Sequence, residues 1–558
     1  MSSSRRNSRI IAARRISPSF TLDLSPNGPS QIRTASRTPT AVDHDDVCED
    51  DQDDIIVEYE HETYGPAPGE KPVDPFEVTM GPNDPDNPKS WSKVYRWYIT
   101  MFSAILVLNA TFASSAPTGV IPQLIEKFGF SVEVAKLTIS LFVVGYCVGP
   151  LLWGPLSEQF GRKPVFIGSF FAYTAFQLGC ALSQNTASIL VFRFLGGTFA
   201  AAPLANSGAV MSDIWDAETR GTALALFALA PFAGPTLGPT VSGFMYVAGV
   251  SWRWVFWLLT LFAGACLVFI VLTLPETYAP VILVKRAQRL RKETGDTRYW
   301  APLERNKMAL SQRISHVLGR PFVLLFREPM LFVMTLYMSF VYGVMYLLFE
   351  AFPIVFAEGH HFNAGESGLT FIPIFVGSVF AVIVYLFYFN PRYARLMKEF
   401  APHPVPPEYR MEVCMLASPI YTISFFWFAW TSYSSISYWA PLMAGFPMGF
   451  AIIFLFLGLI NYAIDAYLFV AASALSAMTV ARSTFGAGFP LFASQMYEKL
   501  NPRWATTLLG FIALLMTPIP FVLRVYGHKI RRHSKFAPTN TGPAPPPKQT
   551  EKPNQTIV

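Results

Sequence analysis

Long apolar stretches recur along most of the chain, and they limit the folds open to it more than any other feature. About twelve of them approach the ~20 residues that an α-helix needs to cross the hydrocarbon core of a bilayer. The expected spans are residues 97–116, 135–156, 165–183, 188–211, 222–246, 254–274, 329–350, 367–388, 411–431, 440–462, 467–492 and 506–526. From 440 to 492 the sequence is almost continuously apolar, and only Asn461 and Asp465 indicate a break. Because helices satisfy their own backbone groups inside a membrane, we expect an all-α membrane protein with twelve transmembrane helices.

The composition supports a membrane protein and argues against several other classes. The chain is 52% hydrophobic and 14% charged, whereas soluble domains have about 25% charged residues. Its net charge of +6 is divided among short segments between apolar stretches, which does not indicate a nucleic-acid-binding patch. The sequence has no Walker-type nucleotide-binding loop, and neither its cysteines nor the adjacent His360 and His361 have the spacing of a metal site. We therefore expect no nucleic acid, nucleotide, metal or cofactor.

Polar segments divide the chain into domains. The first 94 residues are Ser/Pro-rich and charged, with a basic end and an acidic block at 43–62, and we expect them to be disordered. A second polar segment lies between the sixth and seventh spans. The expected domains are a tail at 1–94, a six-helix bundle at 95–275, a central loop at 276–328, a second six-helix bundle at 329–527 and a tail at 528–558. Two pseudo-symmetric bundles that rock about a central site are the layout of many secondary transporters.

The distribution of basic residues predicts the topology. If the N-terminus is cytoplasmic, the inward connections contain Arg162, Lys163, Arg220 and the basic segment from 285 to 327. The outward connections contain only scattered cations such as Lys127. The positive-inside rule then places both termini in the cytoplasm of a multi-pass cell-membrane protein. Joining residues 440–492 into one span would instead place the C-terminus outside.

A short charged hairpin, Gly154 to Pro164, separates the second and third expected spans. Its Gly154, Glu158, Gly161, Arg162 and Lys163 resemble the loop signature of the major facilitator superfamily of transporters, although Glu158 replaces the more usual Asp. The resemblance implies that Arg162 pairs with Asp213 at the end of the fourth span and latches one conformation. The alternative is that these charges only set the topology.

Arg193 lies inside the fourth expected span, in the run Arg-Phe-Leu-Gly-Gly. An arginine inside a membrane is costly and normally faces a cavity or a partner. The run is similar to the superfamily's fourth-helix motif, whose arginine is linked to proton coupling. The alternative is that Arg193 lies near the outer boundary and extends to the lipid headgroups.

The fifth expected span concentrates glycine and proline: Pro231, Gly234, Pro235, Gly238, Pro239 and Gly243. Small residues allow close helix packing, and prolines bend helices. The run resembles the superfamily's antiporter motif, which implies export, although Ser242 stands where a glycine is often found. A role in packing alone is compatible with the same residues.

Three further charged residues are candidates for proton coupling or substrate binding. Glu350 in the seventh span is either a proton carrier or counter-ion for a cationic substrate, or an interfacial residue at the outer helix end. Asp465 is either a cytoplasmic loop charge or a partner of Arg482.

Polar and aromatic residues of the first, second and seventh spans are expected to line a pocket: Asn109, Tyr146, Tyr342 and Tyr346.

Over residues 84–527 the chain resembles the fungal branch of the twelve-span drug:proton antiporters. The resemblance implies a monomeric, proton-coupled exporter of hydrophobic or cationic small molecules, such as drugs, polyamines or secondary-metabolite toxins, across the plasma membrane. Proton-coupled uptake is the alternative within the superfamily. A polytopic membrane enzyme or a non-transporting receptor is the alternative outside it, but no convergent set of nucleophile, base and polar partner is apparent. We expect a transporter and not an enzyme.

Overall fold

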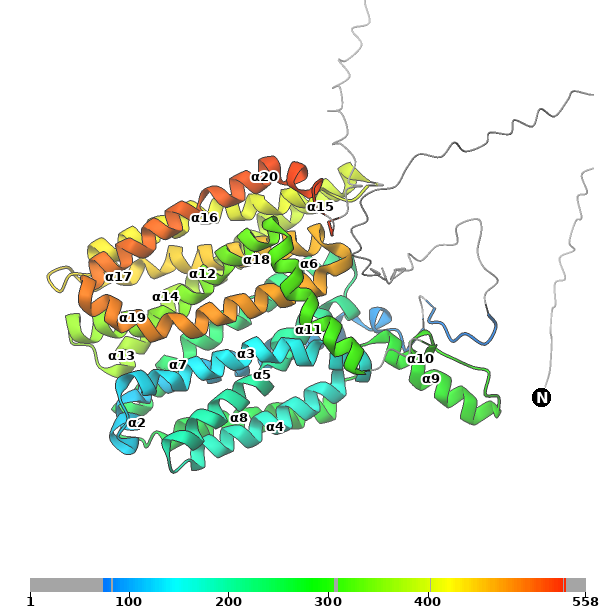
Figure 1. The fold of residues 1–558 in the computed structure, drawn as a ribbon, viewed down its shortest axis with the longest axis horizontal. Helices are drawn as coiled ribbons and strands as arrows, with labels where there is room; N and C mark the ends of the chain where they lie inside the picture. Colours follow the sequence, from blue (N-terminus) through cyan, green and yellow to red (C-terminus); the bar gives the residue numbers. More distant parts are fainter. Residues whose placement is uncertain (1–73, 82–83, 306–309, 402, 535, 538–558) are drawn as a thin grey trace, which may run out of the picture. The chain divides into compact units, whose positions relative to one another are not determined.

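A computed structural model describes residues 74–81, 84–305, 310–401, 403–534 and 536–537 (Figure 1). All of them belong to one compact unit, residues 64–558. The basic end and the acidic block of the expected N-terminal tail, and most of the C-terminal tail, lie outside the described residues.

The described residues are built almost entirely from helices. The first half contains α1 (Lys93–Ser115), α2 (Ile121–Phe128), α3 (Val132–Phe160), α4 (Arg162–Leu182), α5 (Thr186–Ile214), α6 (Ala217–Phe227), α7 (Ala230–Val247) and α8 (Arg253–Thr273), with 3₁₀ turns at Pro88–Ser90 and Ala116–Val120. A connector follows, with α9 (Ala279–Thr294), α10 (Pro302–Arg305) and α11 (Leu310–Arg327).

The second half begins at residue 329. It contains α12 (Pro329–Phe352), α13 (Ala364–Leu369), α14 (Ile372–Val384), α15 (Asn390–Phe400), α16 (Met411–Thr431), α17 (Trp439–Met443), α18 (Gly445–Ala466), α19 (Ala471–Met516) and α20 (Pro518–Arg531). Short π-helical segments at Pro353–Glu358 and Tyr385–Phe389 continue α12 and α14, and 3₁₀ turns occur at Pro407–Arg410 and Leu468–Val470.

Eleven segments of the described chain are long and apolar enough to cross a membrane. The last of them, Ala471–Arg531, is 61 residues long, about three times the length that one crossing requires. The helix breaks inside it at Asn501, which has a left-handed φ of 61° and precedes Pro502. The expected eleventh and twelfth spans are therefore both in this segment, and dividing it at Asn501 accounts for the difference from twelve.

Several expected boundaries shift by a few residues. The tenth span continues through Asp465 to Ala466, so the break lies at 467–470 instead of at Asn461 or Asp465. The expected hairpin at Gly154–Pro164 shrinks to the single residue Gly161, because α3 and α4 are helical on either side of it.

Residues 74–81 and 84–92 have a defined structure, so the expectation of a disordered tail up to residue 94 is wrong for these two segments. Asp84 forms an ion pair with Arg286 of α9, and Val78 N–H donates to the Trp300 carbonyl at 2.9 Å. Val78 is buried with Ala287 and Ala301 of the connector. The polar composition of this segment predicts solvation, but its few apolar residues have a partner surface that is distant in sequence.

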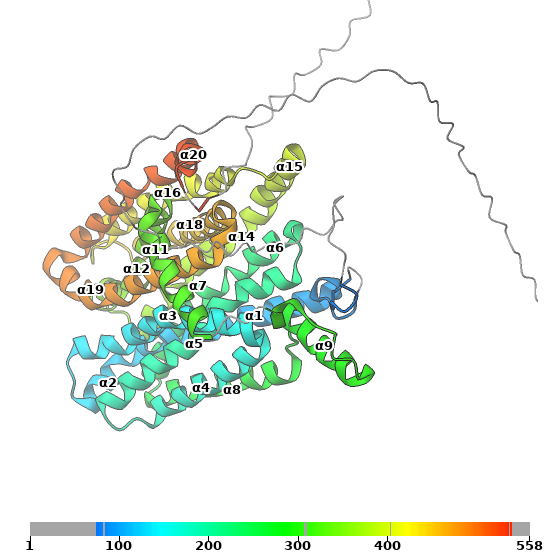
Figure 2. The same ribbon diagram turned by 45° about the vertical axis from the view of Figure 1, so that its right-hand side comes forward.

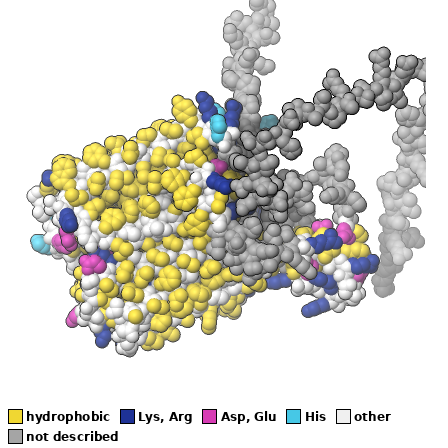
Figure 3. Space-filling model, in the orientation of Figure 1, with side chains coloured by type: hydrophobic (Ala, Val, Ile, Leu, Met, Phe, Trp, Pro, Cys, Tyr) yellow, Lys and Arg dark blue, Asp and Glu magenta, His cyan; other side chains and the backbone are white. Residues whose placement is uncertain are grey.

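The long helices run side by side in both views (Figures 1 and 2). Helices α2, α13 and α17 lie at one end of the bundle, and α6, α9 and α15 lie at the other, which we call the connector end. The face shown in Figure 3 is covered by hydrophobic side chains, and charged ones gather at the ends. Exposed residues such as Leu272 (73%) and Leu515 (80%) would be unfavourable in water, so this surface faces lipid.

The two halves meet along a seam, by which we mean the interface between α1–α8 and α12–α20. Helix α3 packs along α19, and α7 packs against α13 and α14. This pairing is pseudo-symmetric, because each contact joins the second or fifth span of one half to the fifth or second span of the other. Helix α11 of the connector contacts α3 of the first half and α12 and α19 of the second, so the connector touches both halves.

Candidate functional site

The turn between α3 and α4 needs glycine at position 161 for two reasons. Gly161 has φ 98°, which is unfavourable for any residue with a Cβ atom. A Cβ atom here would also collide with the carboxylate of Glu276. That carboxylate accepts hydrogen bonds from Arg162 N–H at 2.8 Å and Lys163 N–H at 3.2 Å. Glu276 therefore caps the positive N-terminal end of α4.

The arginine side chain of this turn connects three elements. Arg162 Nε lies 3.2 Å from Asp213 Oδ2 at the end of α5, and its Nη1 donates to Ser157 in α3. From the start of the connector, Thr277 donates to Asp213 at 3.3 Å, and the Tyr278 ring lies 4.7 Å from the guanidinium. The pair expected between Arg162 and Asp213 is thus present, and both partners are largely buried.

The other residues of the hairpin lie around this pair. Gly154 is inside α3 with no neighbour within 4 Å of a would-be Cβ, Glu158 is exposed near the end of α3, and Lys163 Nζ donates to the Val271 carbonyl at 3.2 Å. The role of Glu276 was not predicted. Glu276 directly follows Pro275 at the end of the sixth expected span, and an acidic residue at this position was the signal in the sequence that could have revealed it.

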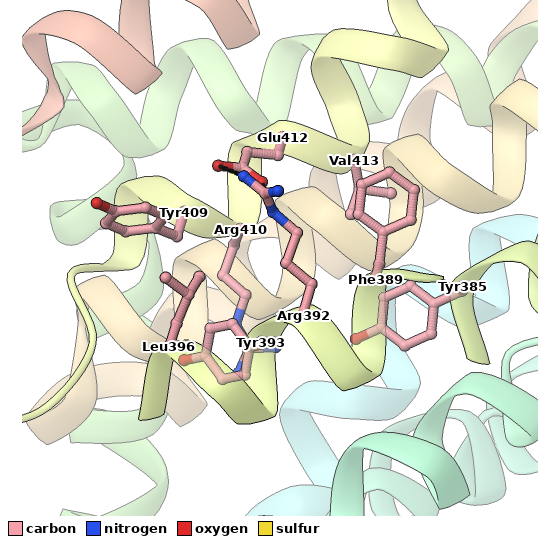
Figure 4. A pocket seen from close by; sticks show the side chains of 9 residues that line it. All are labelled: Tyr385, Phe389, Arg392, Tyr393, Leu396, Tyr409, Arg410, Glu412 and Val413. Atoms are coloured by element: carbon pink, nitrogen blue, oxygen red, sulfur yellow. Dashed lines mark hydrogen bonds and ion pairs between the residues drawn. The ribbon is translucent and has the colours of Figure 1, made fainter. Parts of the chain in front are cut away.

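A similar ion pair occupies the corresponding position in the second half. Arg410 Nε lies 2.8 Å from Asp465 Oδ2, Tyr393 donates to the same oxygen at 3.3 Å, and the Tyr393 ring lies 3.5 Å from the Arg410 guanidinium (Figure 4). Asp213 and Asp465 are each the penultimate residue of their helix. The expected alternatives for Asp465 were a loop charge or a partner of Arg482; both are wrong, because Asp465 is helical and pairs with Arg410.

Figure 4 also shows Arg392 of α15 beside Glu412 of α16. Their side chains are 2.9 Å apart, and Arg524 of α20 reaches the same carboxylate at 3.4 Å. Arg392, Arg410 and Glu412 line a small cavity near the connector end.

Arg193 is fully buried, so the alternative in which it extends to the headgroups is wrong. Its guanidinium donates to three backbone carbonyls: Thr138 at 2.6 Å, Ala113 at 2.8 Å and Ser114 at 3.1 Å. It also lies 4.1 Å from the Phe142 ring. Arg193 thereby joins α5 to α1 and α3 within the first half.

Glu350 is paired with a lysine that was not among the expected site residues. Lys136 Nζ lies 3.9 Å from Glu350 Oε2, and the two side chains are 2% and 11% exposed. Ser494 of α19 donates to the same carboxylate oxygen at 3.2 Å, while Oε1 is buried without a hydrogen-bond partner. The pair crosses the seam, from α3 to α12. A lysine inside an expected apolar span was the signal that could have revealed it.

The glycines and prolines of α7 fit this helix between two neighbours. A Cβ atom at Gly234 would collide with Thr111, and one at Gly238 with Ser115, both on α1. A Cβ atom at Gly243 would collide with the Ala364 backbone of α13, across the seam. Pro231 lies in the first turn of α7, after a break from α6, while Pro235 and Pro239 lie inside the helix. This packing brings the two halves together at the end opposite the connector.

The expected pocket residues differ in their hydrogen bonds: Tyr346 bonds across the seam, whereas Tyr146 and Asn109 bond within the first half. Tyr342 and Tyr346 lie at the seam, where the Tyr346 hydroxyl is 3.0 Å from Ser114 Oγ of the first half. Tyr146 donates to the Ala110 carbonyl at 2.8 Å. Asn109 accepts from Tyr173 at 2.9 Å within the first bundle, so the expectation that it lines a central pocket is wrong.

Comparison with known proteins agrees with this architecture. The family model of the Major Facilitator Superfamily matches residues 103–490. The chain is 42% identical over 466 residues to the multidrug transporter mdrA of Aspergillus fumigatus, covering 83% of this chain and 76% of that one. It is 43% identical over 476 residues to the efflux pump MFS2 of Trichophyton rubrum, covering 85% and 79%.

A solved structure of the xylose transporter XylE from E. coli, in a partially occluded inward-open conformation, shares the fold. Its TM-score is 0.53 at 15% identity, and the match covers 77% of this chain and 99% of that one. A relative above 40% identity over most of both chains and a family match over most of this one establish the relationship. This multi-pass membrane protein belongs to the major facilitator superfamily, whose members are transporters of small molecules and not enzymes.

Proposed function

We propose that this protein exports hydrophobic small molecules from the cytoplasm in exchange for protons, across the plasma membrane. In this proposal the connector end and both termini are cytoplasmic, because the basic connector and the cations of α15 and α20 belong to that side. The names of the two fungal relatives, a multidrug transporter and an efflux pump, support export. The packing of α7 against α13 is consistent with it, because Gly243 of the antiporter-like run lies against the Ala364 backbone of α13 at the end opposite the connector.

The observation that carries proton coupling is the ion pair between Lys136 and Glu350. It joins the two halves through two candidate membrane spans, Val132–Phe160 and Pro329–Glu358, and is almost fully buried. Protonation of Glu350 would remove its charge and leave Lys136 unpaired, which weakens the attraction across the seam. Proton binding and opening of the outer end are then linked, and linkage of this kind is reciprocal.

The two ion pairs at the connector end complete the cycle. Arg162–Asp213 and Arg410–Asp465 each fix the start of one helix to the end of another within a half. We infer that they keep each half rigid while the halves rock against one another, which exposes the seam alternately to the two sides.

The experiment is transport by the purified protein in liposomes with an imposed pH gradient. We expect the gradient to drive a hydrophobic dye in the direction opposite to proton flow, and an uncoupler to abolish this movement. Glu350→Gln should remove gradient-driven transport. Glu358→Gln is the matched control, because Glu358 is exposed on the π-helical segment that follows α12.

Two results would contradict the proposal. Dye movement in the same direction as the protons would indicate uptake. Full gradient-driven transport by Glu350→Gln would remove this carboxylate from the coupling mechanism.

A further inference from the structure

Two arginines inside the spans, Arg193 and Arg482, have different surroundings. Arg193 is held by three backbone carbonyls. In contrast, the Nε atom of Arg482 is buried without a hydrogen-bond partner. Among the described residues no carboxylate forms an ion pair with Arg482. Its guanidinium lies between two rings, 5.2 Å from the centre of Tyr342 and 5.6 Å from that of Phe456.

An uncompensated cation in a membrane interior is costly, and this cost marks a site for a ligand or an ion. The two aromatic rings offset only part of it, because cation–π contacts are weaker than a charge-assisted hydrogen bond to an anion. Arg482 therefore lacks the type of partner that Arg193, Lys136 and Glu350 possess.

Arg482 and its rings lie at the seam. Phe456 contacts Phe232 of the first half, with ring centres 5.2 Å apart. Thr484, two residues beyond Arg482, has its hydroxyl 3.6 Å from the Cys147 sulfur of α3. The Tyr342 hydroxyl is 3.4 Å from that of Tyr346. Any movement that parts the two halves near these contacts uncovers the guanidinium together with two flat aromatic surfaces.

The charges at the seam disfavour a cationic substrate. From the sequence, Glu350 is a candidate counter-ion for such a substrate, but its carboxylate already faces Lys136 at 3.9 Å. Asp213 and Asp465 are paired with arginines near the connector end. These three carboxylates are thus neutralised within the protein, whereas the guanidinium of Arg482 is left for a substrate.

We propose that the transported substrates include planar aromatic organic anions, with the carboxylate bound by Arg482 and the ring lying against Tyr342 and Phe456. The guanidinium presents its N–H donors in a flat fork that matches a carboxylate in two parallel hydrogen bonds. The adjacent rings offer faces on which an aromatic acid stacks. The assignment rests on the proposed function, since it identifies the class of substrate that such an exporter carries.

The first test uses the unmodified protein and three probes of similar size and shape: 1-naphthoate, 1-naphthamide and 1-naphthylmethylammonium. Binding to the full-length protein in nanodiscs is measured at neutral pH by calorimetry. We expect naphthoate to bind at least about tenfold more tightly than the other two, because only the anion forms charge-assisted bonds. Equal binding of the three, or preference for the amide or the ammonium, overturns the proposal.

The second test uses Arg482→Gln and Arg482→Lys in the same assay. We expect Arg482→Gln to lower the ratio of naphthoate to naphthamide affinity by about tenfold and Arg482→Lys to lower it less, since lysine keeps the charge without the fork. An unchanged ratio in Arg482→Gln overturns the proposal. If this variant does not fold, the comparison of the three probes on the unmodified protein decides.

Transport of the same probes distinguishes the two proposals. Gradient-driven export of naphthamide or the ammonium in preference to naphthoate overturns the anion site and supports proton-coupled export. Tight, selective binding of naphthoate with no gradient-driven transport of any probe supports the anion site and overturns the proposed function.

Discussion

At the scale of single residues, the ionisable groups inside the spans differ in what compensates their charge. Lys136 and Glu350 compensate one another across the seam. Arg193 is compensated by carbonyl oxygens, and Arg482, among the described residues, by aromatic rings alone. In our proposals the first pair responds to a proton and the last residue to an anion, whereas Arg193 joins helices.

Reversing the charges of the seam pair tests whether its partners act together. Lys136→Glu and Glu350→Lys should each lower the thermal stability of the purified protein, because each leaves two like charges buried side by side. The cost is about 3 kcal/mol. The double reversal should recover most of the loss. A double variant no more stable than the weaker single variant would show that the two residues do not interact.

Alanine substitutions at the two signature glycines of the hairpin, Gly161 and Gly154, should have opposite effects on stability. Gly161→Ala should destabilise the protein by about 1–2 kcal/mol, because position 161 has a left-handed φ and no room beside Glu276. Gly154→Ala is the control: it lies inside α3 with open space around it, so alanine should be neutral or stabilising. Equal effects in a thermal unfolding measurement would contradict this account of the turn.

At the scale of elements, α7 and the ordered N-terminal segment each make contacts that a helix pattern does not reveal. Helix α7 fits between α1 and α13 because glycine faces both neighbours. Residues 74–81 attach to α9 and to Trp300, far away in the sequence. Both contacts are between elements, and both are testable by small substitutions.

Gly243→Ala should separate α7 from α13, since its methyl group would occupy the space of the Ala364 backbone. Spin labels at Val247 and Leu369, which are exposed on these two helices, should report a longer distance. Gly208→Ala, in an open position on α5, is the control. An unchanged distance in a folded Gly243→Ala protein would show that this contact does not close the end of the bundle.

Attachment of the N-terminal segment should depend on pH through Asp84. Its hydrogen bond from the Arg286 side chain lowers the pKa of the Asp84 carboxyl. A carboxyl with a lowered pKa stabilises the folded state above its unfolded pKa of about 3.9, and this contribution is lost as the pH falls through the folded value.

Hydrogen exchange at residues 74–81 should therefore stay slow from neutral pH down to about pH 4 and rise only below it, after correction for intrinsic exchange rates. Asp84→Asn should raise it already at neutral pH. Equally slow exchange in this variant would mean that the ion pair does not hold the segment.

At the scale of the whole molecule, the sequence predicted local structure better than it predicted which distant side chains pair. Glycines, prolines and apolar lengths act locally, so the helices and the turn at Gly161 were predictable to within a few residues. The pairing of Arg162 with Asp213 came from resemblance to a family. Three other pairings depend on how distant helices pack, which the spacing of residues along the chain does not encode. They are Lys136 with Glu350, Arg410 with Asp465, and Glu276 with the start of α4.

The pseudo-symmetry of the halves explains one of these missed pairs. The end of α18 repeats the end of α5, with an aspartate one residue before the last. Asp213 meets an arginine at the start of the preceding span, and the same rule in the second half leads from Asp465 to Arg410 instead of Arg482. This pair therefore follows from comparing the two halves with one another, and not from the spacing of residues within either half.

The central claim is that substrate and protons cross in opposite directions through the seam, and the most direct measurement is proton movement driven by substrate. Liposomes containing the protein and a trapped pH-sensitive dye start with equal pH on both sides. A transported compound without titratable groups is then added outside. We predict that its entry makes the interior more alkaline, and that Glu350→Gln abolishes this change. An interior that becomes more acidic, or that does not change while the compound enters, would contradict the account.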